Sequence, residues 1–148
     1  TDSGTFDYFT EAIVGREKAS RPDFTASEDD NVLVQGVEGD RYSLGYFGYA
    51  YYEHNRDRMR LVSVDGGDGC VEPTPAAIQT GAYKPLSRPI FIYVNRASLD
   101  RPEVRAFIEF YMQVAGELVR EAGYVALDAA TYQENLESLG EAGGASAG

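Results

Sequence analysis

Cysteine, histidine and lysine are scarce in this chain of 148 residues, and long apolar runs are absent. Cys70 is the only cysteine, which excludes an internal disulfide bond. His54 is the only histidine, so the sequence contains no cluster of cysteine and histidine ligands for a metal ion. No apolar run approaches the roughly 18 residues that a membrane-spanning helix needs. These absences argue against a disulfide-stabilised domain and against a zinc module.

Positive charge is also scarce. The chain carries 24 acidic and 13 basic residues, and its net charge is -11. Such a surface repels nucleic acids and anionic membranes, so we expect neither as a partner. Hydrophobic residues make up 43% of the chain and aromatic residues 12%. This proportion suffices for a packed core, and the length fits one ordinary domain.

Helical and extended patterns alternate along the chain, which predicts an α/β fold. The clearest helix covers residues 103–122, where apolar residues recur three and four positions apart between Pro102 and Gly123. The clearest strand covers residues 89–94, whose nearly continuous apolarity is typical of a strand covered on both faces. Further helices are predicted at 5–14, 50–58, 73–82, 129–139 and from Ser27 or Thr25 as N-cap to Gly39, and further strands at 42–47 and 59–64.

The first candidate for a ligand site is Ser3-Gly4-Thr5, which directly precedes the first predicted helix. The first backbone N–H groups of a helix have no partner within it, and they lie at the positive end of its dipole. Glycine lets a ligand approach the backbone closely, and the two hydroxyls offer further donors. The pattern is therefore typical of an anion-binding helix N-terminus. Plain N-capping by Ser3 or Thr5 is the alternative, because such residues are common before helices.

Asp2 is unusual beside such a site, because an unpaired carboxylate weakens the binding of an anion. It fits if it holds an arginine in place, and it fits equally as a helix-capping acid. The aromatic residues of 46–52 could suggest binding of a sugar or stacking on a nucleobase, but packing between a strand and a helix explains them better. His54 lies in a charged stretch, so we expect it on a solvated surface rather than in a catalytic site. No catalytic motif, nucleotide phosphate loop or metal cluster is apparent, so we expect no enzyme, cofactor or metal.

Five segments resemble, in order, the phosphate-binding proteins of bacterial phosphate ABC transporters. The first, Asp2-Ser3-Gly4-Thr5-Phe6-Asp7-Tyr8-Phe9, resembles the phosphate loop of that family. One such segment is weak evidence, but five in order are specific, and they run from Thr1 to about Leu139. The other four are Ala26-Ser27-Glu28-Asp29-Asp30-Asn31, Leu44-Gly45-Tyr46-Phe47-Gly48-Tyr49-Ala50-Tyr51-Tyr52, Ser87-Arg88-Pro89-Ile90-Phe91-Ile92-Tyr93-Val94 and residues 107–125.

The resemblance implies part of a type II periplasmic-binding-protein fold, in which two α/β lobes close on phosphate. It implies that Ser3, Gly4 and Thr5 donate hydrogen bonds to phosphate, while Asp2 orients an arginine that would precede Thr1. The other contacts, including a carboxylate that recognises protonated phosphate, would also lie upstream, on the first lobe. Residues 1–86 would form part of the second lobe, residues 87–140 the return strand and C-terminal helices of the first lobe, and residues 141–148 a flexible tail.

The implied function is capture of inorganic phosphate in the periplasm or cell envelope for uptake by an ABC transporter. The expected partners are inorganic phosphate, the permease subunits of the transporter and the missing N-terminal part of the same protein. Alternatives are a binding protein for another oxyanion such as sulfate or molybdate, and a non-transport interaction module of the same fold. A phosphatase-like enzyme is disfavoured, because the sequence shows no nucleophile or metal ligand near Thr5.

Overall fold

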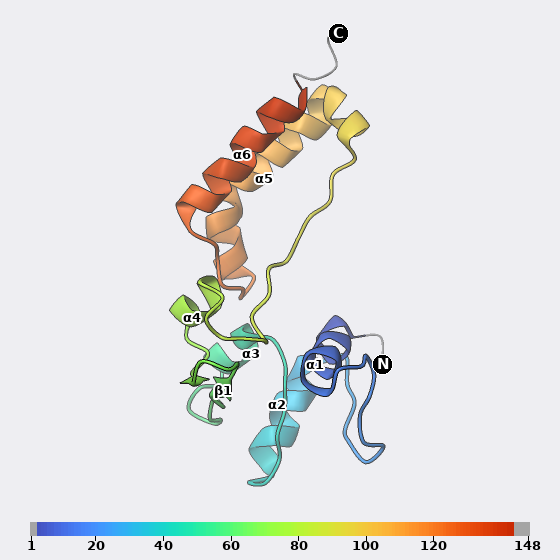
Figure 1. Ribbon diagram of the computed structural model, residues 1–148, viewed down its shortest axis with the longest axis vertical. Helices are drawn as coiled ribbons and strands as arrows, with labels where there is room; N and C mark the ends of the chain where they lie inside the picture. Colours follow the sequence, from blue (N-terminus) through green and yellow to red (C-terminus); the bar gives the residue numbers. More distant parts are fainter. Residues whose placement is uncertain (1–2, 144–148) are drawn as a thin grey trace. The chain divides into compact units, whose positions relative to one another are not determined.

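The computed structural model describes residues 3–143, which form two compact units that meet in the sequence between Arg88 and Pro89 (Figure 1). Short helices and one small sheet make up the first unit, and two long helices dominate the second. The first unit contains α1 (Gly4–Val14), α2 (Asp30–Gly39), α3 (Tyr49–Glu53), β1 (Val64–Asp65), β2 (Cys70–Val71) and α4 (Pro75–Gln79). The second contains the 3-10 helix η1 (Arg96–Asp100), α5 (Pro102–Glu121) and α6 (Ala129–Gly143).

Helix α1 confirms the helix predicted at 5–14. Ser3 is its N-cap, and the Ser3 hydroxyl oxygen accepts the backbone N–H of Phe6 at 3.3 Å. Gly15 ends the helix in the left-handed conformation, with φ 79°, and its N–H donates to the carbonyl of Glu11 at 2.9 Å. Glycine is favoured there because any side chain crowds the backbone at positive φ.

Helix α2 begins later than predicted, and the predicted caps Ser27 and Thr25 are wrong. Asp29 is the cap, because its carboxylate accepts the backbone N–H of Asn31 at 2.9 Å. The Ser27 hydroxyl instead accepts the N–H of Asp29 at 3.0 Å, so it shapes the turn before the helix. Val34 of α2 is 3% exposed and is part of the small core of this unit.

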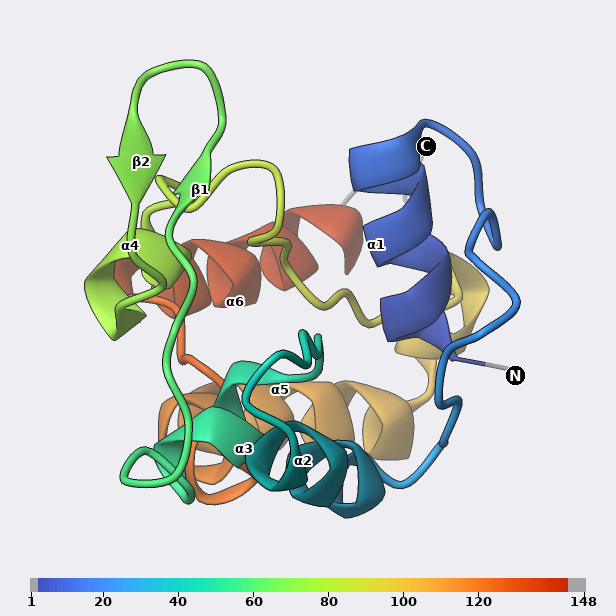
Figure 2. The ribbon, with the colours of Figure 1, turned by 90° about the horizontal axis from the view of Figure 1, so that it is seen from below.

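The remaining elements of the first unit are short. Strands β1 and β2 pair antiparallel as a hairpin, and α4 follows directly (Figure 2). The Asp65 carboxylate holds the hairpin turn by accepting the N–H groups of Gly67 and Gly69. The predicted helices at 50–58 and 73–82 exist, but α3 and α4 have only five residues each.

Most of the predicted strands do not form within the described residues. The segment 42–47 is irregular, only Val64 of 59–64 is in a strand, and 89–94 is an extended segment without a paired neighbour (Figure 1). A strand needs the N–H and C=O groups of an adjacent strand, which a sequence pattern does not supply. In the segment 89–94 the apolar side chains of residues 90–93 are accordingly exposed, from 43% for Ile92 to 92% for Tyr93, and Val94 is half-buried.

The second unit is a helical hairpin, in which α5 and α6 run side by side and η1 packs against both (Figure 1). Pro102 occupies the first turn of α5, as the sequence predicts, and Gly123 follows the helix with φ 85°. Helix α6 extends to Gly143, past the predicted end, so residues 141–143 of the predicted tail are helical. The rest of that tail lies outside the described residues. The core of this unit consists of Leu99, Ile108, Ala115 and Ala126.

Candidate anion-binding site

The structure places Ser3, Gly4 and Thr5 at the N-terminus of α1, as the sequence predicts. Ser3 is the half-buried N-cap, and Gly4 and Thr5 are the exposed first two residues of the helix. The N-capping alternative therefore holds for Ser3 and not for Thr5. Asp2, predicted to orient an arginine, lies outside the described residues.

The cap leaves two backbone donors at this helix end. The N–H of Phe6 donates to the Ser3 hydroxyl, and the N–H of Asp7 donates to the Ser3 carbonyl at 3.0 Å. The N–H groups of Gly4 and Thr5 have no partner within the helix, because the carbonyls four residues earlier precede it. These two donors lie at the positive end of the helix dipole, on an exposed surface. The arrangement suits an anion.

One arginine also lies against this helix end. The Arg88 Nη2 group donates a hydrogen bond to the Gly4 carbonyl at 3.4 Å, and the guanidinium carbon lies 4.6 Å from the centre of the Tyr8 ring. The Tyr8 hydroxyl in turn donates to the Pro85 carbonyl. The sequence alone indicates no role for Arg88, because 84 positions separate it from Gly4 and no spacing rule connects them.

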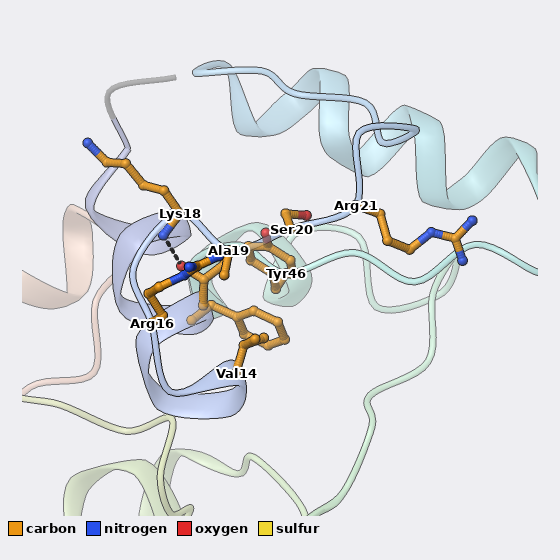
Figure 3. Close-up of a pocket in the computed structure, with 9 residues that line it drawn as sticks. Val14, Arg16, Lys18, Ala19, Ser20, Arg21 and Tyr46 are labelled. Carbon is orange, nitrogen blue, oxygen red and sulfur yellow. Dashed lines mark hydrogen bonds between the residues drawn. The ribbon is translucent and has the colours of Figure 1, made fainter.

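A pocket of about 580 Å³ lies elsewhere on the first unit, between α1, the loop after it and Tyr46 (Figure 3). The side chains of Lys18 and Arg21 point away from it in Figure 3. Lys18 lies 3.7 Å from the Asp7 carboxylate, and Arg21 forms an ion pair with Asp23. Carboxylates therefore compensate the charges of Lys18 and Arg21, two of the three basic residues that line the pocket; Arg16 is the third.

The aromatic residues of 46–52 make internal contacts, as the packing interpretation predicts. Tyr46 stacks on Phe9 with ring centres 3.8 Å apart, and burial raises the pKa of Tyr46. The Tyr49 hydroxyl donates to the Glu53 carboxylate at 2.5 Å. Burial and this hydrogen bond raise the pKa of Tyr49 to about 12, and the same bond lowers the pKa of Glu53.

Neither His54 nor a metal-binding group adds a candidate site within residues 3–143. His54 is exposed at the end of α3, where its ring Nδ1 lies 2.8 Å from the Ala50 carbonyl oxygen. Among residues 3–143, no group of three acidic, histidine or cysteine side chains could hold a metal ion. No helix in that described range is both long and apolar enough to span a membrane.

Comparisons with known proteins agree with the predicted resemblance. A protein of Synechococcus elongatus named Protein SphX is 49% identical over 133 residues, which are 89% of this chain and 39% of that protein. The phosphate-binding protein PstS of Staphylococcus haemolyticus is 40% identical over 140 residues, which are 92% of this chain and 42% of that protein. No protein-family model matches the chain.

A solved structure agrees as well. The crystal structure of a possible phosphate binding protein from Planctomyces limnophilus matches with a TM-score of 0.79 and 47% identity. The match covers 96% of this chain and 51% of that chain. The chain thus has part of the fold of a phosphate-binding protein, which confirms the predicted partial α/β fold class.

These matches confirm the resemblance to phosphate-binding proteins. Among the similar proteins are several that are named PstS. The chain spans about two fifths of the length of the curated relatives that it matches.

Proposed function

We propose that this chain is the part of an extracytoplasmic phosphate receptor that holds one side of the phosphate, through Ser3, Gly4 and Thr5. The observation that carries the proposal is the start of α1, where Gly4 and Thr5 are exposed residues whose N–H groups have no partner within the helix. The similarity to phosphate-binding proteins supports phosphate as the anion.

The proposed activity is capture without chemistry. Neutral N–H and hydroxyl donors hold the anion, so the net charge of -11 does not prevent binding. When two lobes close on phosphate, water leaves, and each hydrogen bond to the charged ion becomes stronger. The receptor then delivers phosphate to the permease of an ABC transporter, in the periplasm or cell envelope.

The complete receptor is this chain preceded by an N-terminal part equivalent to that of its relatives. Residues 1–86 would belong to the second lobe, and residues 87–140 would return to the first lobe. The contacts from the first lobe would come from the preceding part, so we expect the isolated chain of 148 residues to bind phosphate poorly.

Substitution of Thr5 by alanine in the complete receptor tests the proposed site. It removes a hydroxyl donor at an exposed position, and we expect phosphate binding to weaken by about 1–3 kcal/mol, the cost of a lost hydrogen bond to a charged group. Substitution of the exposed loop residue Thr25 by alanine is the matched control and should leave the affinity unchanged. Wild-type affinity in the Thr5→Ala variant would remove Thr5 from the site.

A further inference from the structure

Arg88 contacts α1 through a carbonyl group and an aromatic ring rather than through an ion pair. Arg21, Arg56 and Arg58 each form an ion pair with a carboxylate. Among the described residues, no carboxylate lies within ion-pair distance of Arg88. The Arg88 guanidinium instead contacts the Gly4 carbonyl and lies over the face of the Tyr8 ring.

This placement is electrostatically unfavourable for the helix alone. The N-terminus of an α-helix carries a partial positive charge, so it disfavours a cation near its first turn. The chain has 24 carboxylates and 13 basic residues, so partners of opposite charge are plentiful elsewhere. An anion bound at the same helix end would attract the Arg88 charge, so the net electrostatic interaction of Arg88 at this end would become favourable.

The hydrogen bond also fixes one peptide group of the proposed site. Gly4 C=O and Thr5 N–H belong to the same planar peptide, and in a trans peptide these two groups point in opposite directions. Because Arg88 holds the Gly4 carbonyl, it also holds the direction of the Thr5 N–H. The Tyr8 ring under the guanidinium and the bond from the Tyr8 hydroxyl to Pro85 limit the movement of Arg88.

We propose that Arg88 is a positioning residue of the phosphate site, which orients the Gly4–Thr5 peptide and adds positive charge at the start of α1. This inference rests on the proposed function, because it assigns a role toward the same anion. Arg88 acts through Gly4 and through its charge, and no direct contact with phosphate is part of the proposal. The competing explanation is that the contact of Arg88 with Gly4 and Tyr8 only stabilises the first unit.

The test uses the complete receptor and two measurements that separate these explanations. Phosphate titration by calorimetry at several salt concentrations gives the affinity and its salt dependence, and urea unfolding without phosphate gives the stability. Arg88→Gln should weaken phosphate binding about tenfold or more and flatten the salt dependence, because it removes a charge near the anion. Arg88→Lys keeps the charge but not the planar group over Tyr8, so its affinity should be intermediate.

Arg21→Gln is the matched control, because Arg21 is an exposed arginine of the same unit whose charge Asp23 compensates. It should change neither the affinity nor its salt dependence. An Arg88→Gln variant that loses stability but keeps both the wild-type affinity and the wild-type salt dependence would overturn the inference and support a purely stabilising role of Arg88. If Arg88→Gln does not fold, Tyr8→Leu replaces it as the test, because this variant removes the aromatic ring under Arg88 and keeps the Arg88 charge. Weaker phosphate binding by Tyr8→Leu would support the inference, and wild-type affinity would overturn it.

Failure of the proposed function gives a different result. A wild-type receptor that binds no phosphate contradicts the proposed function, and the role of Arg88 falls with it. A wild-type receptor that binds phosphate, with an equally tight Arg88→Gln variant, contradicts only the role of Arg88.

Discussion

Substitution of Gly4 by alanine should change helix stability and phosphate binding in opposite directions. Gly4 is the first residue of α1, and among residues 3–143 a Cβ atom at this position would meet only Arg88 Nη2, at the ordinary contact distance of 3.8 Å. Its φ is not positive, so alanine adopts the same conformation without strain. Alanine in a helix interior is favoured over glycine by roughly 0.5–1 kcal/mol. At the first position we expect the lower end, a gain of about 0.5 kcal/mol in the free energy of unfolding.

The added methyl group should weaken phosphate binding, because it stands where the anion approaches the backbone. We expect a loss of about tenfold, which corresponds to about 1.4 kcal/mol. Urea unfolding without phosphate and calorimetric titration with phosphate measure the two effects on the complete receptor. Gly36→Ala is the matched control, because Gly36 lies inside α2 with nothing within 4 Å of an added Cβ.

The control should gain stability and keep its affinity for phosphate. If Gly4→Ala gains stability and binds phosphate as tightly as the wild type, close approach to the Gly4 backbone is not part of the site. If Gly4→Ala loses stability while Gly36→Ala gains it, the conformation assigned to Gly4 is wrong.

Three further predictions concern the first unit. Thr10→Val should lower the free energy of unfolding by about 1–3 kcal/mol, because Thr10 is 2% exposed and its hydroxyl accepts the Lys18 N–H at 2.8 Å; urea unfolding that shows no loss would refute this. The pKa of Tyr49 is raised to about 12 in the folded state, above the ordinary value near 10, so stability should fall as the pH rises from 10 toward 12. The difference in tyrosinate absorbance between wild type and Tyr49→Phe should centre near pH 12 rather than 10. Gly15→Ala should destabilise by roughly 1–2 kcal/mol in the same unfolding assay, opposite to Gly36→Ala, because its φ is 79°; equal stability would contradict the left-handed cap.

The sequence predicts the helices well where the signals are local. The cap at Ser3, the stop at Gly15 and the apolar spacing of 103–122 depend on residues a few positions apart, and α1 and α5 follow them closely. The predicted N-cap of α2 is wrong because serine, threonine and aspartate residues close together in the sequence can all cap a helix. Only the geometry shows that Asp29 prevails.

Contacts between distant parts of the chain escape such local signals. The segment 89–94 has the composition of a strand, but no neighbouring strand is present among the described residues. Arg88 reaches α1 from 84 positions away, so its contact with Gly4 has no local signature. The proposed anion site at Ser3-Gly4-Thr5 could be suggested from the sequence only because its residues are consecutive and resemble a known family.

Calorimetric titration of the complete receptor with inorganic phosphate, with sulfate as competitor, tests the central claim most directly. The account predicts heat of binding with phosphate and little competition by sulfate. The carboxylate expected in the preceding part of the receptor would accept the proton of phosphate, and it would disfavour sulfate, which carries no proton to donate. No heat with phosphate, or equal competition by sulfate, would contradict it.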